Sequence, residues 1–205
     1  MSARLFTDDI LFFQRILKAE RLYTGKLDGD WGSRTETAAQ QFMQQSEQIK
    51  TSTRSFDMRT EGRIATLALV AQKQARLCLA RIIDGGIVAR IISGTRTYAE
   101  QGALYKQGRY GNPGKIITKA NSGQSNHNFG IAWDIGIFTA AGGYLGDGVE
   151  YDKAGNLGRS DLVEWGGEWK NFVDKPHYQL RLGKPVSQLR AEFEAGTLVY
   201  PKTEL

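Results

Sequence analysis

The chain has 205 residues, of which 40% are hydrophobic and 24% charged, so it is long enough for a packed core in one large domain or two smaller ones. Its formal net charge of +5 favours anionic partners, but the basic residues are scattered and form no nucleic-acid-binding motif, so nucleic acid is not an expected partner. The single cysteine, Cys78, excludes an intrachain disulfide and is expected to be a buried thiol.

The first residues contain neither a signal-peptide core nor a membrane span. The apolar run Ile10–Phe13 is four residues long and is followed by Gln14 and Arg15. We therefore expect no transmembrane segment. We also expect a protein made in the cytoplasm without a signal peptide, which would need another route to any site outside the membrane.

The N-terminal part has the pattern of a helix, a turn and a second helix. Thr7 or Asp8 can cap a first helix, and a glycine-containing loop follows over residues 23–32. Ser33-Arg34-Thr35-Glu36 is a capping-box sequence that opens the second helix. The polar stretch 44–54 is interpreted as a linker, which predicts a helical domain over residues 1–60 and a second domain over residues 61–205.

The second domain is expected to begin with a long helix. Apolar periodicity predicts this helix from about Arg63 to Ile83, where the sequence Asp84-Gly85-Gly86 ends it. A mostly buried strand follows over residues 86–93, and then a short helix over residues 98–106. Residues 108–126 are rich in glycine and asparagine and are expected to form a loop.

Two later segments alternate as half-buried strands do. From Gly130 onward, apolar residues occupy every second position, and Asp134 lies on the opposite face between two small residues. In the strand over residues 176–182, His177 and Gln179 share the polar face in the same way. Two strands would thus each offer one metal-ligating side chain from the surface of a sheet.

The only two histidines of the chain, His127 and His177, both lie in motifs that suit a metal ion. Neutral imidazole is the commonest transition-metal ligand, and a catalytic zinc site has three protein ligands and an open position. His127, Asp134 and His177 would supply the three ligands. Asp174 would then be left for a separate role.

The sequence from Ser125 to Asp134 matches Ser-x-His-x-x-Gly-x-Ala-x-Asp in full, and Asp174-x-x-His177 supplies its second half. With Ser93-Gly94-Thr95-Arg96-Thr97 and Glu164-Trp165-Gly166-Gly167-Glu168-Trp169, the chain resembles the zinc D-alanyl-D-alanine carboxypeptidase and L-alanyl-D-glutamate endopeptidase family over residues 64–182. The resemblance implies an α+β fold, with a small antiparallel sheet and flanking helices (the hedgehog/DD-peptidase-like zinc fold), preceded by a small all-helical domain. It also implies that His127, Asp134 and His177 bind Zn²⁺.

The same resemblance implies roles for three further residues. Asp174 would be the general base, and Arg96 would hold the substrate carbonyl or the developing oxyanion. Ser125 would line the substrate cleft. Two alternatives stay open, because Arg96 could instead cap a neighbouring element and Ser125 could only orient His127.

The N-terminal segment resembles the three-helix peptidoglycan-binding domain. The resemblance rests on residues 23–32 and on a following helix that ends in Gln41-Phe42, and it spans residues 6–60. It implies that Tyr23 and Trp31 contact sugar. The alternative is a helical brace for the catalytic domain.

These observations together predict a zinc metallopeptidase that degrades bacterial peptidoglycan. An L-Ala–D-Glu endopeptidase acting as a monomeric phage endolysin, released through a holin, is the preferred interpretation. A secreted antibacterial effector and a host autolysin are the alternatives for its biological setting. The alternatives for its activity are a D-Ala–D-Ala carboxypeptidase of the same family and a non-catalytic, zinc-stabilised peptidoglycan-binding protein.

Overall fold

The computed structural model describes residues 7–146 and 148–203, and the chain divides into two compact units. We call them the helical unit and the sheet unit. The helical unit consists of Met1–Gln45, Arg96–Phe129 and Lys184–Lys202; the sheet unit consists of Ser46–Thr95, Gly130–Gly183 and Thr203–Leu205. The expected functional division at residue 60 stays a prediction.

The helical unit contains α1 (Thr7–Ala19), the first part of α2 (Ser33–Ser52), α5 (Tyr98–Lys106), the 3₁₀ turn η1 (Asn126–Phe129) and α7 (Val186–Ala195). Aromatic side chains from three segments form its core. The ring of Phe193 on α7 lies 5.4 Å from that of Phe12 on α1 and 5.5 Å from that of Phe129 on η1. The buried Tyr200 hydroxyl donates a hydrogen bond to the Phe129 carbonyl at 2.6 Å. These contacts fix the position of η1 within its own unit.

The glycine-containing loop after α1 is held by the buried side chain of Gln14. Its Nε2 donates to Asp28 Oδ1 and to the carbonyl of Asp30, both at 3.0 Å. Its Oε1 accepts from the backbone N–H groups of Asp28 and Gly29. Gly29 has φ +75°, a left-handed conformation that glycine adopts without strain. One amide side chain therefore fixes the backbone of this loop.

The second helix is longer than expected, because most of the stretch 44–54, interpreted as a linker, is helical. Helix α2 continues to Ser52 because this polar stretch consists mostly of good helix formers, such as Gln44 and Glu47. Ile49 is fully buried and anchors the stretch. Composition alone cannot distinguish a polar helix from a polar linker when the apolar positions are this few.

The long helix predicted from Arg63 to Ile83 is two helices, α3 (Met58–Ile64) and α4 (Leu69–Asp84). Asp57 caps α3 by accepting from the backbone N–H groups of Arg59 and Thr60. The helix is interrupted at residues 65–68, where the N–H of Ala68 donates to the carbonyl of Gly130 at 2.9 Å. This long-range backbone bond overrides the local apolar periodicity.

The sheet unit contains a small antiparallel sheet, which confirms the expected α+β class. Its strands are β1 (Ala89–Ser93), β2 (Ala132–Phe138), β3 (Tyr144–Leu145), β4 (Val163–Trp165) and β5 (His177–Leu180). The order is β1-β2-β5-β4, and the short β3 pairs with the end of β2. Strands β1, β2 and β5 each begin one to three residues later than expected, and β5 also ends earlier. The predicted helix over residues 98–106 is confirmed as α5.

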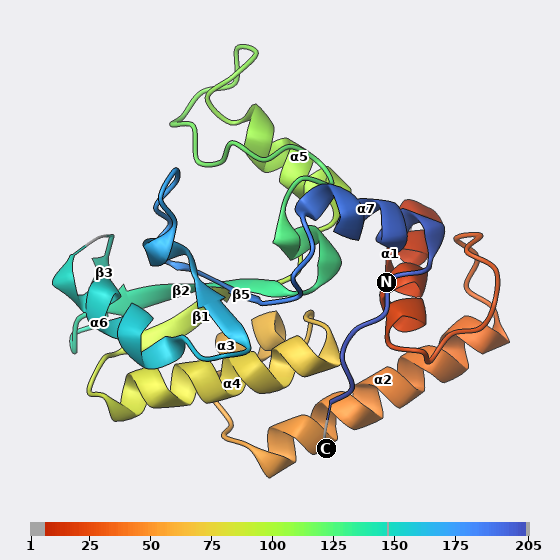
Figure 1. Ribbon diagram of the computed structural model, residues 1–205, viewed down its shortest axis with the longest axis horizontal. Helices are drawn as coiled ribbons and strands as arrows, with labels where there is room; N and C mark the ends of the chain where they lie inside the picture. Colours follow the sequence, from red (N-terminus) through yellow and green to blue (C-terminus); the bar gives the residue numbers. More distant parts are fainter. Residues whose placement is uncertain (1–6, 147, 204–205) are drawn as a thin grey trace. The chain divides into compact units, whose positions relative to one another are not determined.

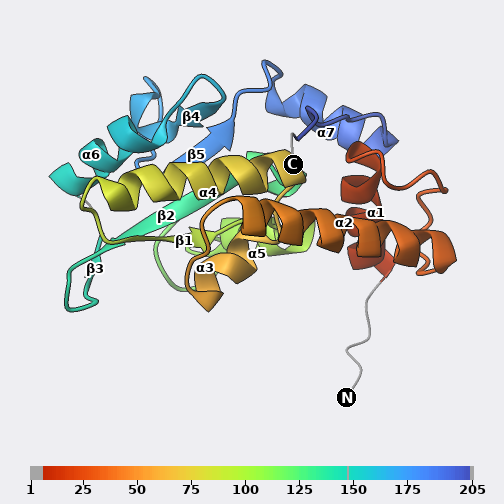
Figure 2. The ribbon, with the colours of Figure 1, turned by 90° about the horizontal axis from the view of Figure 1, so that it is seen from below.

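Helices α4 and α6 (Val149–Gly158) pack against this sheet, and α4 runs along it in Figures 1 and 2. Trp133 and Tyr178 stack at 6.2 Å on neighbouring strands. A Cβ atom on Gly158 would lie 2.6 Å from the Tyr178 ring and 2.9 Å from the Cys78 sulfur, so glycine is required for this close packing. Cys78 is buried as expected. Within the described residues, no helix has the length and hydropathy to cross a lipid bilayer.

Candidate metal centre

Asp134 and His177 lie side by side on neighbouring strands. The antiparallel register pairs Asp134 of β2 with His177 of β5, so both side chains are on the same face of the sheet. The Nδ1 atom of His177 lies 3.1 Å from Oδ1 of Asp134. The alternation read from the sequence therefore predicted the correct face for both residues.

The orientation of the His177 ring follows from a chain of three polar side chains. Gln179 Nε2 donates to Glu164 Oε2 at 3.0 Å, because a carboxylate can only accept. The Gln179 oxygen then faces Nε2 of His177 at 3.0 Å and accepts its N–H. In neutral His177 the other nitrogen, Nδ1, consequently carries a lone pair that points at the Asp134 carboxylate.

Two acceptors in contact need a positive charge between them. Either a proton or a metal ion can fill this role, because a lone pair and a carboxylate otherwise repel each other. In the metal-free protein the pKa of His177 is raised. Burial would lower it, but the hydrogen bond and the charge of Asp134 outweigh the burial, and Gln179 adds to the rise. The local charge arrangement therefore favours a cation at this point.

His127 lies on η1 and is buried. Its backbone N–H donates to Ser125 Oγ at 3.4 Å, and its carbonyl accepts from the backbone N–H of Arg96 at 3.1 Å. The possible ligand atoms of His127, Asp134 and His177 all lie within 4.8 Å of one another. Two imidazoles and one carboxylate form a donor set that suits zinc. These three residues form a group that could hold a metal ion.

Asp174 lies one tight turn before His177. The N–H of His177 donates to the Asp174 carbonyl at 3.2 Å, and the N–H of Asp174 donates to the carbonyl of Gly166 at 3.0 Å. A Cβ atom at position 166 would lie 2.5 Å from the Asp174 carbonyl oxygen, so glycine permits this turn. The half-buried Asp174 contributes negative charge at His177.

Arg96 and Ser125 flank the same turn that carries His127. Arg96 donates to Gln101 Oε1 at 3.2 Å, while its backbone carbonyl accepts from Asn128 Nδ2 at 2.9 Å. The N–H of Ser125 donates to Oδ1 of the same asparagine at 3.3 Å. Asn128 is fully buried and ties the arginine, the serine and the histidine turn together.

Sequence reasoning missed the supporting roles of Asn128, Gln179, Glu164 and Trp169. The Trp169 indole N–H donates to Glu164 Oε1 at 2.5 Å, and its ring lies 5.1 Å from that of His177. The position of Gln179 two residues after His177 was the available signal, because side chains at i and i+2 share a face of a strand. Asn128 gives no comparable signal, since its role depends on contacts with residues far away in the sequence.

The two predicted sugar contacts differ in exposure. Tyr23 is 6% exposed, and its hydroxyl donates to the Lys26 carbonyl at 2.7 Å, so it supports the loop. Trp31 is 40% exposed and stacks on Phe13 at 6.2 Å. Its indole N–H donates to Glu36 Oε2 at 2.7 Å, so this carboxylate holds the ring. Of these two residues, Trp31 is the one that presents a substantial aromatic surface to solvent.

Comparisons with known proteins define the class. A peptidase M15 family model described as D-alanyl-D-alanine carboxypeptidase matches residues 118–180, the segment that contains His127, Asp134, Asp174 and His177. The peptidoglycan L-alanyl-D-glutamate endopeptidase CwlK of Bacillus subtilis (strain 168) is 37% identical over 122 residues, or 54% of this chain and 71% of that relative. The chain therefore belongs to the M15 family of metallopeptidases.

A solved structure is also similar to this chain. It is the crystal structure of the Serratia marcescens L-Ala D-Glu endopeptidase ChiX, with a TM-score of 0.48 and 25% sequence identity. The match covers 62% of this chain and 90% of that chain.

Proposed function

We propose that this protein is a zinc-dependent endopeptidase that hydrolyses the L-Ala–D-Glu bond of bacterial peptidoglycan. The observation that carries the proposal is the contact between His177 Nδ1 and Asp134 Oδ1 at 3.1 Å, which calls for a cation between two acceptors. His127 supplies the third ligand of the group. The bond specificity follows the curated relative, an L-alanyl-D-glutamate endopeptidase.

The residues would divide the chemistry as follows. His127, Asp134 and His177 would hold Zn²⁺, which when bound polarises a carbonyl group and lowers the pKa of water. Asp174 would accept the proton of the attacking water and pass it to the leaving amine, a role typically worth about 10²–10⁴-fold in rate. Arg96 would stabilise the negative charge that develops on the carbonyl oxygen. Ser125 would line the cleft and keep the turn of His127 in place.

The test combines metal analysis with product analysis. Purified protein loaded with zinc should release fragments that carry new amino-terminal glutamate from a defined muropeptide, whereas release of terminal alanine would indicate a carboxypeptidase. Asp174→Asn should retain zinc and lose about 10²–10⁴-fold in rate. Asp161→Asn is a matched control, because Asp161 is an exposed carboxylate just before β4.

Three results would contradict these assignments. Asp174→Asn near the parent rate would remove the base assignment. A zinc-loaded protein that cleaves no muropeptide would favour a non-catalytic, zinc-stabilised binding protein. Failure to retain zinc would remove the metal assignment itself.

We further propose that the N-terminal region binds the wall polymer through Trp31, as expected of an endolysin. Its exposed ring offers a stacking surface, and the net charge of +5 favours an anionic wall. Trp31→Ala should weaken co-sedimentation with purified walls and leave hydrolysis of a soluble peptide unchanged. Met43→Ala removes another exposed apolar side chain of α2 without changing the charge and is the control. Equal sedimentation of the parent and Trp31→Ala would favour the helical brace.

A further inference from the structure

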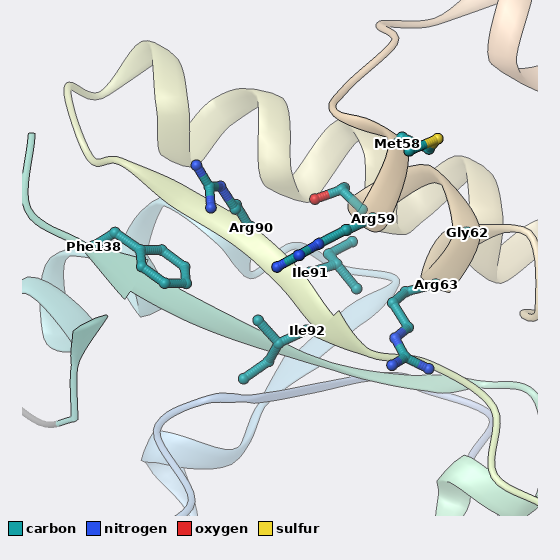
Figure 3. Close-up of a pocket in the computed structure, with 9 residues that line it drawn as sticks. Met58, Arg59, Gly62, Arg63, Arg90, Ile91, Ile92 and Phe138 are labelled. Atoms are coloured by element: carbon teal, nitrogen blue, oxygen red, sulfur yellow. The ribbon is translucent and has the colours of Figure 1, made fainter. Parts of the chain in front are cut away.

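A pocket of about 600 Å³ lies in the sheet unit beside β1, the end strand of the sheet order. Arginine side chains line much of it: Arg59 and Arg63 from α3 and Arg90 from β1. Figure 3 shows Arg59 extending across β1 toward the space between Arg90 and Ile92. Its apolar part includes Ile92 and Phe138, so the pocket combines positive charge with an apolar surface.

The pocket lies on the same face of the sheet as Asp134. Asp134, Gly136 and Phe138 alternate along β2, so their positions share one face. The register pairs Arg90 with Gly136, and a Cβ atom on Gly136 would lie 3.0 Å from Ile92 Cγ2 and 3.2 Å from the Phe138 ring. At roughly 3.3 Å per residue, Gly136 and Phe138 are about 7 and about 13 Å along β2 from Asp134.

Asp57 acts on Arg90 electrostatically, but the arginines of this pocket form no ion pair with a carboxylate in the part of the chain that the structure describes. All three side chains are exposed, and the Arg90 guanidinium lies over the Phe138 ring at 4.9 Å.

The acidic residue at the start of α3 is already engaged. Asp57 Oδ2 accepts from the Thr60 hydroxyl at 2.7 Å, and Oδ1 accepts from the backbone N–H groups that it caps. The pKa of Asp57 is lowered, because these hydrogen bonds outweigh the effect of burial and the charge of Arg90 adds to them. Because the three guanidinium groups are exposed and make no ion pair with Asp57, an external anion can reach them.

We propose that this arginine pocket is a substrate subsite that binds a carboxylate of the peptide being cleaved. The proposal rests on the proposed function. The free carboxyl group of the glutamate belongs to the residue at the scissile bond, whereas the carboxylate that ends the peptide stem lies further along the chain. An extended peptide with its scissile bond near Asp134 places groups two to four residues away over the pocket, at about 7–13 Å. Guanidinium groups are the preferred partners of carboxylates. Ile92 and Phe138 would contact the apolar part of the bound peptide.

The experiment uses two synthetic stem peptides that are identical except for the carboxylate two to four residues from the scissile bond. In one peptide this group is free, and in the other it is the uncharged amide. The parent enzyme should cleave the acid with a kcat/KM about 10-fold or more above that of the amide, since a charge-assisted hydrogen bond typically contributes this much. Arg59→Gln combined with Arg90→Gln should abolish most of this preference through KM, with cleavage of the amide unchanged.

Lys153→Gln is the matched control, because Lys153 is an exposed cation on α6 and its substitution changes the charge by the same sign. It should retain the preference for the acid. Retention of the preference in the double variant would overturn the proposal, as would equal cleavage of both peptides by the parent enzyme. Thermal unfolding identifies a variant that fails to fold, and the single variants Arg59→Gln and Arg90→Gln then carry the test.

A direct binding measurement separates this proposal from the proposed function. Isothermal titration calorimetry of both peptides against the intact protein reports carboxylate selection without hydrolysis. If neither peptide is cleaved but the acid binds more tightly and the double variant loses the difference, the subsite stands and the proposed function fails. If the acid is cleaved and both peptides bind equally to parent and double variant, the subsite fails and the proposed function stands.

Discussion

Replacing Gln179 with leucine should weaken metal binding by about 10- to 100-fold, the usual effect of losing a partner that orients a ligating histidine. The Gln179 oxygen accepts the Nε2 proton of His177 at 3.0 Å, and His177 is only 6% exposed. Without this acceptor, a buried N–H group loses its partner, which costs about 1–3 kcal/mol. The proton could then move to Nδ1, the nitrogen that faces Asp134, and oppose a metal ion there.

The assay is a competition between the protein and a chromophoric zinc chelator at fixed pH, with metal-free protein as the reference. Glu164→Gln should have a smaller effect, because the amide oxygen can still accept from Gln179 while the orientation of Gln179 becomes less strict. Gln188→Leu is the control, since the amide of Gln188 is bonded to Glu192 on the exposed surface of α7. A change below twofold for Gln179→Leu would refute the assignment of the His177 nitrogen atoms.

Two further predictions concern stability. Glu61→Ala leaves the guanidinium of Arg76, which is 2% exposed, without its carboxylate, so the free energy of unfolding should fall by about 3–5 kcal/mol in urea titrations at pH 7. The pKa of Glu61 is lowered because, although burial raises it, the hydrogen bond and charge of Arg76 and the backbone N–H of Phe56 prevail. The pair therefore contributes its full stability above the unfolded pKa of Glu61, about 4.5, and this stability is lost as the pH falls through the lower pKa of the folded state. A free energy of unfolding with the same pH dependence in Glu61→Ala and in the parent would contradict this. Gly155→Ala should lower the free energy of unfolding by about 1–3 kcal/mol, because its Cβ would lie 2.3 Å from the indole ring of Trp165 on β4. The control is Gly62→Ala, whose Cβ would meet nothing within 4 Å, so it should be neutral or stabilising in thermal unfolding.

Two of the three residues of the candidate site, Asp134 and His177, could be placed from the sequence because they lie on strands with strict alternation. Asp134 and His177 occur at positions where apolar residues define one face, so the opposite face follows from the period of two. The helix boundaries were harder to predict. The break at residues 65–68 depends on a backbone bond to Gly130, and no local pattern encodes a contact that distant. The length of α2 depends on a single buried residue, Ile49, in an otherwise polar stretch.

Strand β2 connects the proposed metal ligand with the proposed carboxylate subsite, and Gly136 lies between them. Because every second side chain of a strand lies on the same face at a fixed spacing, the distance from Asp134 to the pocket is set by the strand backbone rather than by a loop conformation. A side chain at position 136 would crowd Ile92 and Phe138, so glycine leaves the face open between the two sites. A peptide lying along β2 would therefore meet a cation at one point and guanidinium groups a defined distance away. This arrangement can select an anionic substrate in one register.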